Sequence, residues 1–143
     1  MAVAAIDFGF KRLGVAVSDA AGIGVYPLKT ISRTSLKADL NRLRDLLGPR
    51  QITKLVIGLP LNMDGTGSSL ARAACGFAER LKRELPFEIE MFDERLTSFE
   101  ARERIKAAFL GGARRSRQID ARAAAVILET YLAATNQENG RPR

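Results

Sequence analysis

The chain of 143 residues contains no histidine and only one cysteine, Cys75. Without histidine, a Ser-His-Asp or Cys-His nucleophile, a His-Cys zinc site and a histidine general base are all impossible. One cysteine cannot form a disulfide within the chain, and the helical apolar pattern around Cys75 predicts a small core residue. Any chemistry must therefore rest mainly on carboxylates, and carboxylates held at strand ends usually hold metal ions.

Long apolar runs are missing as well. No run approaches the ~18–20 apolar residues that a membrane-spanning helix requires. The N-terminus leads directly into a strand, without the basic region and apolar core of a secretion signal. The composition, 46% hydrophobic and 27% charged, is typical of one soluble globular domain. We therefore expect a cytoplasmic protein with no membrane partner.

Positive charge is in excess. The chain has 23 Lys and Arg against 16 Asp and Glu, a formal net charge of +7. This balance suits a polyanionic partner such as nucleic acid. A basic soluble protein without such a partner has the same composition, so charge alone says little about mechanism.

The hydrophobic pattern predicts an α/β domain over residues 1–135, followed by a flexible C-terminal tail, 136–143. Three strands come first, and the third contains Pro27, which is typical of an edge strand. Helices and strands then alternate, which indicates an antiparallel hairpin joined to parallel β-α-β units. The expected strands are 2–7, 13–18, 25–31, 55–59 and 87–92, and the expected helices are 36–47, 69–85, 97–109 and 119–134, with a loop at 62–68 and a basic loop at 111–117.

Acids stand where two of these strands end. Asp7 follows the apolar residues 3–6, and Gly9 lets the backbone turn closely there. Asp93 and Glu94 follow the strand 87–92. If the two strands lie side by side, their terminal acids converge, and two carboxylates ~4 Å apart repel by roughly 4 kcal/mol at an effective dielectric near 20, so such a cluster needs a cation. The alternative is structural: Asp7 caps its own turn, and an acid after the later strand caps the next helix.

A third acid, Asp120, stands at the head of the last expected helix, where acids are also common for capping and dipole reasons. Strand alternation puts Asp93 and Glu94 on opposite faces, so we expect only one of them to join Asp7. Such an acid set suits Mg²⁺ or Mn²⁺. Two ions about 4 Å apart would bridge a scissile phosphate, one activating the attacking water and the other stabilising the leaving oxygen.

Basic residues adjoin these acids. Lys11 and Arg12 lie in the turn after Asp7, and an arginine cluster occupies the expected loop before Asp120. A solvated charge run is the usual explanation of such a stretch. We favour contacts with a nucleic-acid backbone because each cluster adjoins a proposed metal ligand. The predicted nucleic-acid-binding residues are Lys11, Arg12, Arg95, Arg114, Arg115 and Arg117.

With these motifs placed, the chain resembles the YqgF family, also called RuvX or Holliday-junction-resolvase-like proteins. The resemblance covers about residues 2–135, in family order and spacing. Each piece is weak alone, and together they are highly specific. The matching pieces are Asp7-Phe-Gly with Lys11-Arg12-Leu-Gly14-Val-Ala-Val-Ser18-Asp19, Val56-Ile-Gly58-Leu-Pro60 with Asp64-Gly65, Asp93-Glu94-Arg95-Leu96-Thr97-Ser98, and Ile119-Asp120-Ala-Arg-Ala-Ala-Ala125.

The resemblance implies an RNase H-like fold, with a mixed five-stranded sheet flanked by helices on both faces. It also implies a metal-dependent nuclease that matures the 5′ end of precursor 16S rRNA, with precursor ribosomal particles as a further partner. By position, Asp7, Glu94 and Asp120 match the family's proposed catalytic acids, which favours Glu94 over Asp93 as the ligand. Similar sequences often carry a lysine before Asp120, where this chain has arginines, which keep the charge and bind phosphate well.

Three other functions compete with an RNA endonuclease. A branched-DNA resolvase would use the same chemistry but should be a symmetric dimer that cuts two strands. A non-catalytic nucleic-acid-binding assembly factor could use a nuclease-like fold, although the retained acids argue against it. A sugar-kinase-like or actin-like ATPase also opens with Asp-x-Gly and a hairpin, but it needs two such domains to close over ATP.

Overall fold

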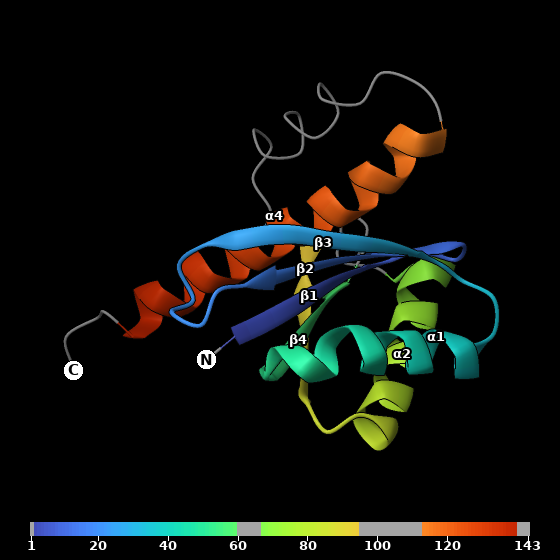
Figure 1. The fold of residues 1–143 in the computed structure, drawn as a ribbon, viewed down its shortest axis with the longest axis horizontal. Helices are drawn as coiled ribbons and strands as arrows, with labels where there is room; N and C mark the ends of the chain where they lie inside the picture. Colours follow the sequence, from blue (N-terminus) through green and yellow to red (C-terminus); the bar gives the residue numbers. More distant parts are fainter. Residues whose placement is uncertain (1, 60–66, 95–112, 140–143) are drawn as a thin grey trace.

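One mixed five-stranded sheet organises the protein (Figure 1). The computed structural model describes residues 2–59, 67–94 and 113–139, with the backbone alone for 113–120 and 136–139. The strand order is β3-β2-β1-β4-β5. Strands β1, β2 and β3 pair antiparallel, whereas β4 pairs parallel with β1 and with β5. The predicted hairpin followed by parallel units is therefore confirmed. The elements are β1 (Ala2–Phe8), β2 (Arg12–Ser18), β3 (Val25–Ser32), α1 (Leu36–Leu47), a 3-10 turn (Gly48–Arg50), β4 (Ile52–Leu59), α2 (Ser69–Glu84), β5 (Glu88–Asp93) and α4 (Ala113–Asn139).

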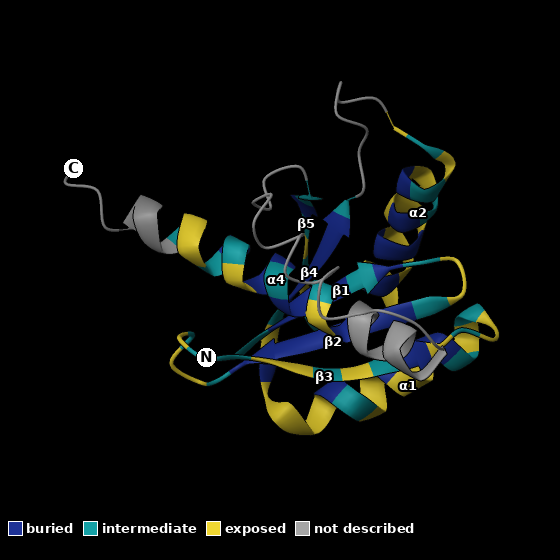
Figure 2. Ribbon diagram, turned by 90° about the horizontal axis from the view of Figure 1, so that it is seen from above, coloured by how far each residue is buried: buried dark blue, intermediate teal, exposed yellow. Residues whose placement is uncertain are grey.

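Helices cover both faces of the sheet, and strand alternation sends side chains into two separate cores. On β1, Ile6 and Phe8 belong to the core beneath α1 and α2, whereas Ala5 belongs to the core beneath α4. Figure 2 shows the inner strands almost wholly buried between these layers. On β4, the same alternation separates Ile57 from Val56. A side chain of β1 or β4 that shares the face of Ala5 and Val56 therefore lies on the α4 side.

The edge position predicted from Pro27 is confirmed, because β3 is the outermost strand next to β2. The pairing register shifts at this point: Val15 pairs with Lys29, and the next residue, Ala16, pairs with Pro27. One residue of β3 is therefore extra, as in a β-bulge. Proline cannot donate to a ladder, and an edge strand with a bulge tolerates that loss.

Both α1 and α2 begin at a serine cap. Ser68 Oγ accepts a hydrogen bond from the Ala71 backbone N–H at the start of α2. The prediction that Cys75 is a core residue was wrong, because its side chain is exposed. The buried face of α2 contains Ala74 and Ala78, and Cys75 lies about 100° around the helix from Ala74.

The boundaries of the last helix also differ from those expected. It begins at Ala113, so Arg114, Arg115 and Arg117 lie in helical backbone rather than in a loop. It continues to Asn139, so residues 136–139 of the expected tail are helical too. No glycine or proline interrupts 113–139, and its alanine, arginine, glutamine and glutamate favour a helix. The expected helix 97–109, and most of the expected loop 62–68, lie outside the described residues.

Strand β4 begins at Ile52, three residues before the expected start, because Ile52 pairs with Ala2 of β1. In the described part of the chain, no helix is long and apolar enough to cross a membrane.

Candidate active site

Two of the predicted acids meet at the carboxyl end of the parallel strands. Asp7 is the penultimate residue of β1, and Glu94 directly follows the last residue of β5. Their carboxyl groups share a hydrogen bond, and the negative charge of Asp93 also acts on Glu94. A hydrogen bond between two carboxyl groups requires a proton on one of them. The structure thus brings Asp7 and Glu94 into contact, with Asp93 near enough to act on Glu94.

The two acids do not come from neighbouring strands, contrary to the expectation that their strands lie side by side. Strand β4 lies between β1 and β5, which places those strands about 10 Å apart. The acids meet above Gly58 of β4, the partner of Phe92 in the ladder with β5. A Cβ on Gly58 would collide with Glu94 Oε1 and lie 2.7 Å from Ile127 Cδ1 of α4. Because Gly58 has no side chain, the Glu94 carboxyl group has room to reach Asp7.

The surroundings of Glu94 disfavour its charged form. Burial raises the pKa of Glu94 above its ordinary value, and the negative charge of Asp93 raises it further. The hydrogen bond with Asp7 acts in the opposite direction but does not reverse the shift. A bound cation would favour the charged form of both carboxyl groups. Carboxylate oxygens are the ligands that Mg²⁺ and Mn²⁺ prefer, so these residues fit such an ion.

The third predicted acid, Asp120, lies in the helical backbone of α4, and its side chain is not described. Position 120 precedes Ile127 by two helical turns, and Ile127 packs against Gly58. Within the described ranges, no set of three or more acidic, cysteine or histidine side chains is arranged to hold a metal. The contact between Asp7 and Glu94 is therefore the part of the predicted acid set that the structure brings together.

The turn between β1 and β2 places basic residues beside Asp7. The Gly9 N–H donates to the Arg12 carbonyl at 3.0 Å, and a Cβ on Gly9 would lie only 2.8 Å from that oxygen. This close approach explains the glycine. The turn frames a pocket of about 320 Å³, lined by Asp7, Gly9, Phe10, Lys11 and Arg12. The predicted phosphate-binding residues Lys11 and Arg12 thus share a pocket with Asp7, whereas Arg95 lies outside the described residues.

The sequence analysis did not identify Arg33, whose side chain holds this turn in place. Its Nη1 donates to the Gly9 carbonyl at 3.1 Å, and its Nε donates to Asp39 Oδ2 at 3.1 Å. The guanidinium lies over the rings of Phe8 and Phe77, 4.8 Å and 5.4 Å from their centroids. Asp39 is only 1% exposed. An acid on the apolar face of the expected helix 36–47 was the available signal for this buried ion pair.

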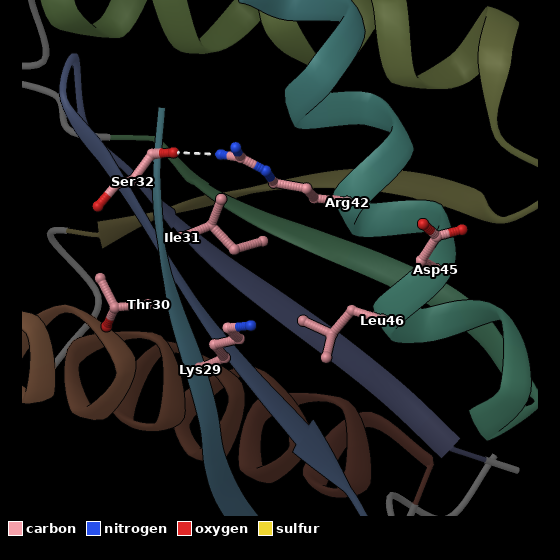
Figure 3. Close-up of a pocket in the computed structure, with 7 residues that line it drawn as sticks. All are labelled: Lys29, Thr30, Ile31, Ser32, Arg42, Asp45 and Leu46. Carbon is pink, nitrogen blue, oxygen red and sulfur yellow. Dashed lines mark hydrogen bonds between the residues drawn. The ribbon is translucent and has the colours of Figure 1, made fainter. Parts of the chain in front are cut away.

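A second and larger hollow lies between β3 and α1 (Figure 3). It has a volume of about 480 Å³ and is lined by Lys29, Thr30, Ile31, Ser32, Arg42, Asp45 and Leu46. Arg42 Nη1 donates to the Ser32 carbonyl at 2.6 Å, so this basic group closes one side of the hollow. The hollow shares no residue with the turn pocket and contains a single acid, so it does not extend the carboxylate site.

Comparisons with known proteins agree with this architecture. The family model described as "RuvX: Holliday junction resolvase" matches residues 1–134. A protein of Anaeromyxobacter sp. (strain K) named "Putative pre-16S rRNA nuclease" is 42% identical over 127 residues, which are 89% of this chain and 93% of that protein. A protein of the same name from Maridesulfovibrio salexigens is 39% identical over 133 residues, 93% of this chain and 98% of that protein.

Among solved structures, Thermus thermophilus RuvC in complex with a Holliday junction substrate is similar, with a TM-score of 0.60 over 94% of this chain and 96% of that chain. The sequence identity is 14%, so this likeness concerns the fold alone. The mixed sheet with helices on both faces is accordingly the RNase H-like fold.

Proposed function

The chain belongs to the RuvX family, and on that premise we propose that it is a metal-dependent nuclease whose substrate is the 5′ region of precursor 16S rRNA. The observation that carries the proposal is the contact between Asp7 and Glu94 above Gly58. The shared name of the relatives supports an RNA substrate. The net charge of +7 supports a polyanionic partner, which includes precursor ribosomal particles.

Asp7, Glu94 and Asp120 are the proposed ligands of Mg²⁺ or Mn²⁺. Position 120 shares a helix face with Ile127, because residues seven apart are two turns apart. That face of α4 packs on the side of the sheet that contains Gly58. When bound, the ions would activate the attacking water and stabilise the leaving oxygen, as in a two-metal hydrolysis. No imidazole or covalent nucleophile is needed, which agrees with a chain without histidine.

The chain's own residues then orient the substrate. Lys11 and Arg12 line the pocket that contains Asp7, so they can hold a phosphate next to the acids. Arg114, Arg115 and Arg117 add positive charge in the first turns of α4, before Asp120. Each of these contacts would neutralise backbone phosphate without reading base sequence.

Cleavage of branched DNA is the second candidate. The description of the family supports it, and so does the similarity to a resolvase fold. A resolvase must cut two strands symmetrically, which requires two copies of this chain. The RNA substrate is preferred because the relatives that cover most of this chain are named for it.

The test is cleavage of a precursor 16S RNA fragment and, in parallel, of a four-way DNA junction. Each substrate is incubated with Mg²⁺, with Mn²⁺ and with a chelator, and the Asp7→Asn protein is the control in each condition. We expect metal-dependent cutting of the RNA that the variant loses, while the variant binds RNA as well as or better than the wild type because one negative charge is gone. Cutting of the junction alone would select the resolvase, and binding without cutting of either substrate would select a non-catalytic assembly factor.

A further inference from the structure

Phe10 is a solvent-exposed aromatic side chain in the same pocket as Asp7, one of the proposed metal ligands. It is 58% exposed, and it lines the same pocket as Asp7 and Lys11. Its neighbour Phe8, two residues earlier, is buried in the core beneath α1 and α2. The turn therefore buries one phenylalanine and presents the other at the site.

The backbone that presents Phe10 is fixed on both sides. Gly9 is held by its own N–H bond to the Arg12 carbonyl and by Arg33 Nη1 on its carbonyl oxygen. Lys11 is held through its carbonyl oxygen, which accepts the Arg33 backbone N–H at 2.8 Å. With both neighbours of Phe10 anchored, its Cα position is set in advance of any ligand. A preorganised aromatic residue loses little conformational entropy when a planar group stacks on it.

The residues around the Phe10 ring indicate which planar group would stack on it. Lys11 and Arg12 are suited to backbone phosphate, and Asp7 is a proposed ligand of the ion that meets the scissile phosphate. A base attached to the neighbouring nucleotide would lie within reach of an aromatic ring in the same pocket. Bases in a continuous duplex are stacked on each other and cannot offer a face, whereas unpaired bases stack readily on aromatic side chains.

We propose that Phe10 is a stacking platform for an unpaired nucleobase next to the scissile phosphate, which makes single-stranded or locally unpaired RNA the substrate class. This inference rests on the proposed nuclease function and deepens it. It adds a base contact to a site that would otherwise touch only phosphate, and stacking of this kind tolerates any base.

Another exposed apolar side chain supplies the comparison. Ile23 is 84% exposed and lies between β2 and β3. Because β2 runs antiparallel to β1, the residues after Ser18 lie at the opposite end of the sheet from the turn that carries Phe10. Exposure alone therefore does not distinguish Phe10 from Ile23. Phe10 differs because it shares a pocket with Asp7, Lys11 and Arg12.

The sequence contains no tryptophan, so Phe10→Trp introduces a single fluorescent reporter at the proposed contact. Ile23→Trp is the matched control at the far end of the sheet. Each variant is titrated, in chelator so that no cleavage occurs, with single-stranded RNA, with fully paired RNA and with a single strand of abasic nucleotides. Binding is measured independently by anisotropy of end-labelled RNA.

We expect single-stranded RNA to quench Phe10→Trp, abasic and paired strands to leave it nearly unchanged, and Ile23→Trp to respond to none of them. Phe10→Ala should lower the affinity for single-stranded RNA between roughly 5-fold and 100-fold, the range that base–aromatic stacking supplies, and Phe10→Leu should not restore it. The affinity of Phe10→Ala for paired RNA should equal that of the wild type, and this result would also show that Phe10→Ala is folded. Normal binding by anisotropy without quenching would overturn the stacking contact and leave the nuclease proposal standing. Absence of any RNA binding by the wild type would overturn both.

Discussion

Gly58 and Glu94 occupy complementary space: the carboxyl group of Glu94 lies where a side chain on Gly58 would begin. Gly58 stands on β4, between the strands that carry the two acids. Any larger residue there would separate Glu94 from Asp7. Gly58 therefore positions Glu94 by having no side chain.

We expect Gly58→Ala to weaken the proposed metal site. The added methyl group would push the Glu94 carboxyl group away from Asp7, and residues that support metal ligands typically change affinity 10- to 100-fold. The overlap with Ile127 should also destabilise the fold by about 1–3 kcal/mol. Mn²⁺ affinity is measured by calorimetry, and stability is measured by urea unfolding.

Two further variants separate the metal site from ordinary packing. Gly58→Ala combined with Ile127→Val removes the clash with the core but not the clash with Glu94, so stability should recover and Mn²⁺ affinity should not. Gly76→Ala on α2 adds a methyl group that meets nothing within 4 Å, and it should leave the affinity unchanged. Recovery of affinity together with stability in the double variant would show that Gly58 serves packing alone.

A second prediction concerns the ion pair beneath the turn. Arg33→Met leaves the buried carboxylate of Asp39 without its charged partner, which should lower the free energy of unfolding by about 3 kcal/mol. Arg33→Lys keeps a charge near Asp39 but cannot also bind the Gly9 carbonyl, so it should cost only about 1 kcal/mol. Urea unfolding measures both. Equal losses in the two variants would mean that the charge of Arg33 contributes nothing.

A third prediction concerns acid stability, through Tyr131 of α4. Its hydroxyl donates to Glu90 of β5 and accepts from Lys54 Nζ of β4 at 2.9 Å. The hydrogen bond from Tyr131 holds the pKa of Glu90 below its ordinary value of 4.5. A lowered folded pKa contributes stability that is present above the ordinary value and lost as the pH falls through the folded value.

Tyr131→Phe should therefore cost about 1 kcal/mol near neutral pH, because both partners are partly exposed and the contact is partly screened. The difference from wild type should narrow as the pH falls below about 4.5. Tyr26→Phe, at an exposed tyrosine on β3, is the control and should show neither effect. The measurement is urea unfolding at pH values from about 3 to about 8, because Glu90 is charged in the upper part of this range and becomes protonated only in the lower part. If the difference in the free energy of unfolding between Tyr131→Phe and the wild type is the same at every pH, the contact with Glu90 does not contribute to stability.

Much of the architecture could be predicted from the sequence because it depends on local patterns. Apolar runs ending in Asp7 and Asp93 predicted strands with acids at the same edge, and Pro27 predicted the edge strand. The position of β4 between the two acidic strands could not be predicted in this way, since pairing order is decided by packing over long sequence separations. Without that order, Gly58 is one glycine among twelve, and its role becomes visible only when the strands are assembled.

The basic start of α4 shows that a prediction from local sequence alone can also be wrong. Two glycines, Gly111 and Gly112, suggested a loop that continued through the arginines, but helix propensity prevails from Ala113 onward. In the same way, the ion pair of Arg33 with Asp39 joins the end of β3 to α1, and no spacing rule links those two positions. The sequence pattern therefore predicted the type of most elements, but it misplaced the start of α4 and could not predict contacts between elements such as the Arg33–Asp39 ion pair.

The last prediction concerns the arginines at the start of α4. If Arg114, Arg115 and Arg117 contact backbone phosphate, replacing all three with alanine should weaken binding to every sequence and lower the slope of log K against log salt by roughly one per lost contact. The control removes the same charge from α2, on the other face of the sheet, by replacing the exposed Arg72, Arg80 and Arg83 with alanine.

The two triple variants have the same net charge, so a long-range electrostatic effect would change both slopes equally. A direct contact changes the slope for the α4 variant alone. The measurement is the anisotropy of labelled single-stranded RNA between roughly 50 and 200 mM salt, where phosphate contacts dominate the change in affinity. A slope that falls only in the α2 variant would move the binding surface to the opposite face of the sheet, away from Asp7 and Glu94. Because the acids lie on the α4 side, that result would also separate RNA binding from the proposed site of cleavage.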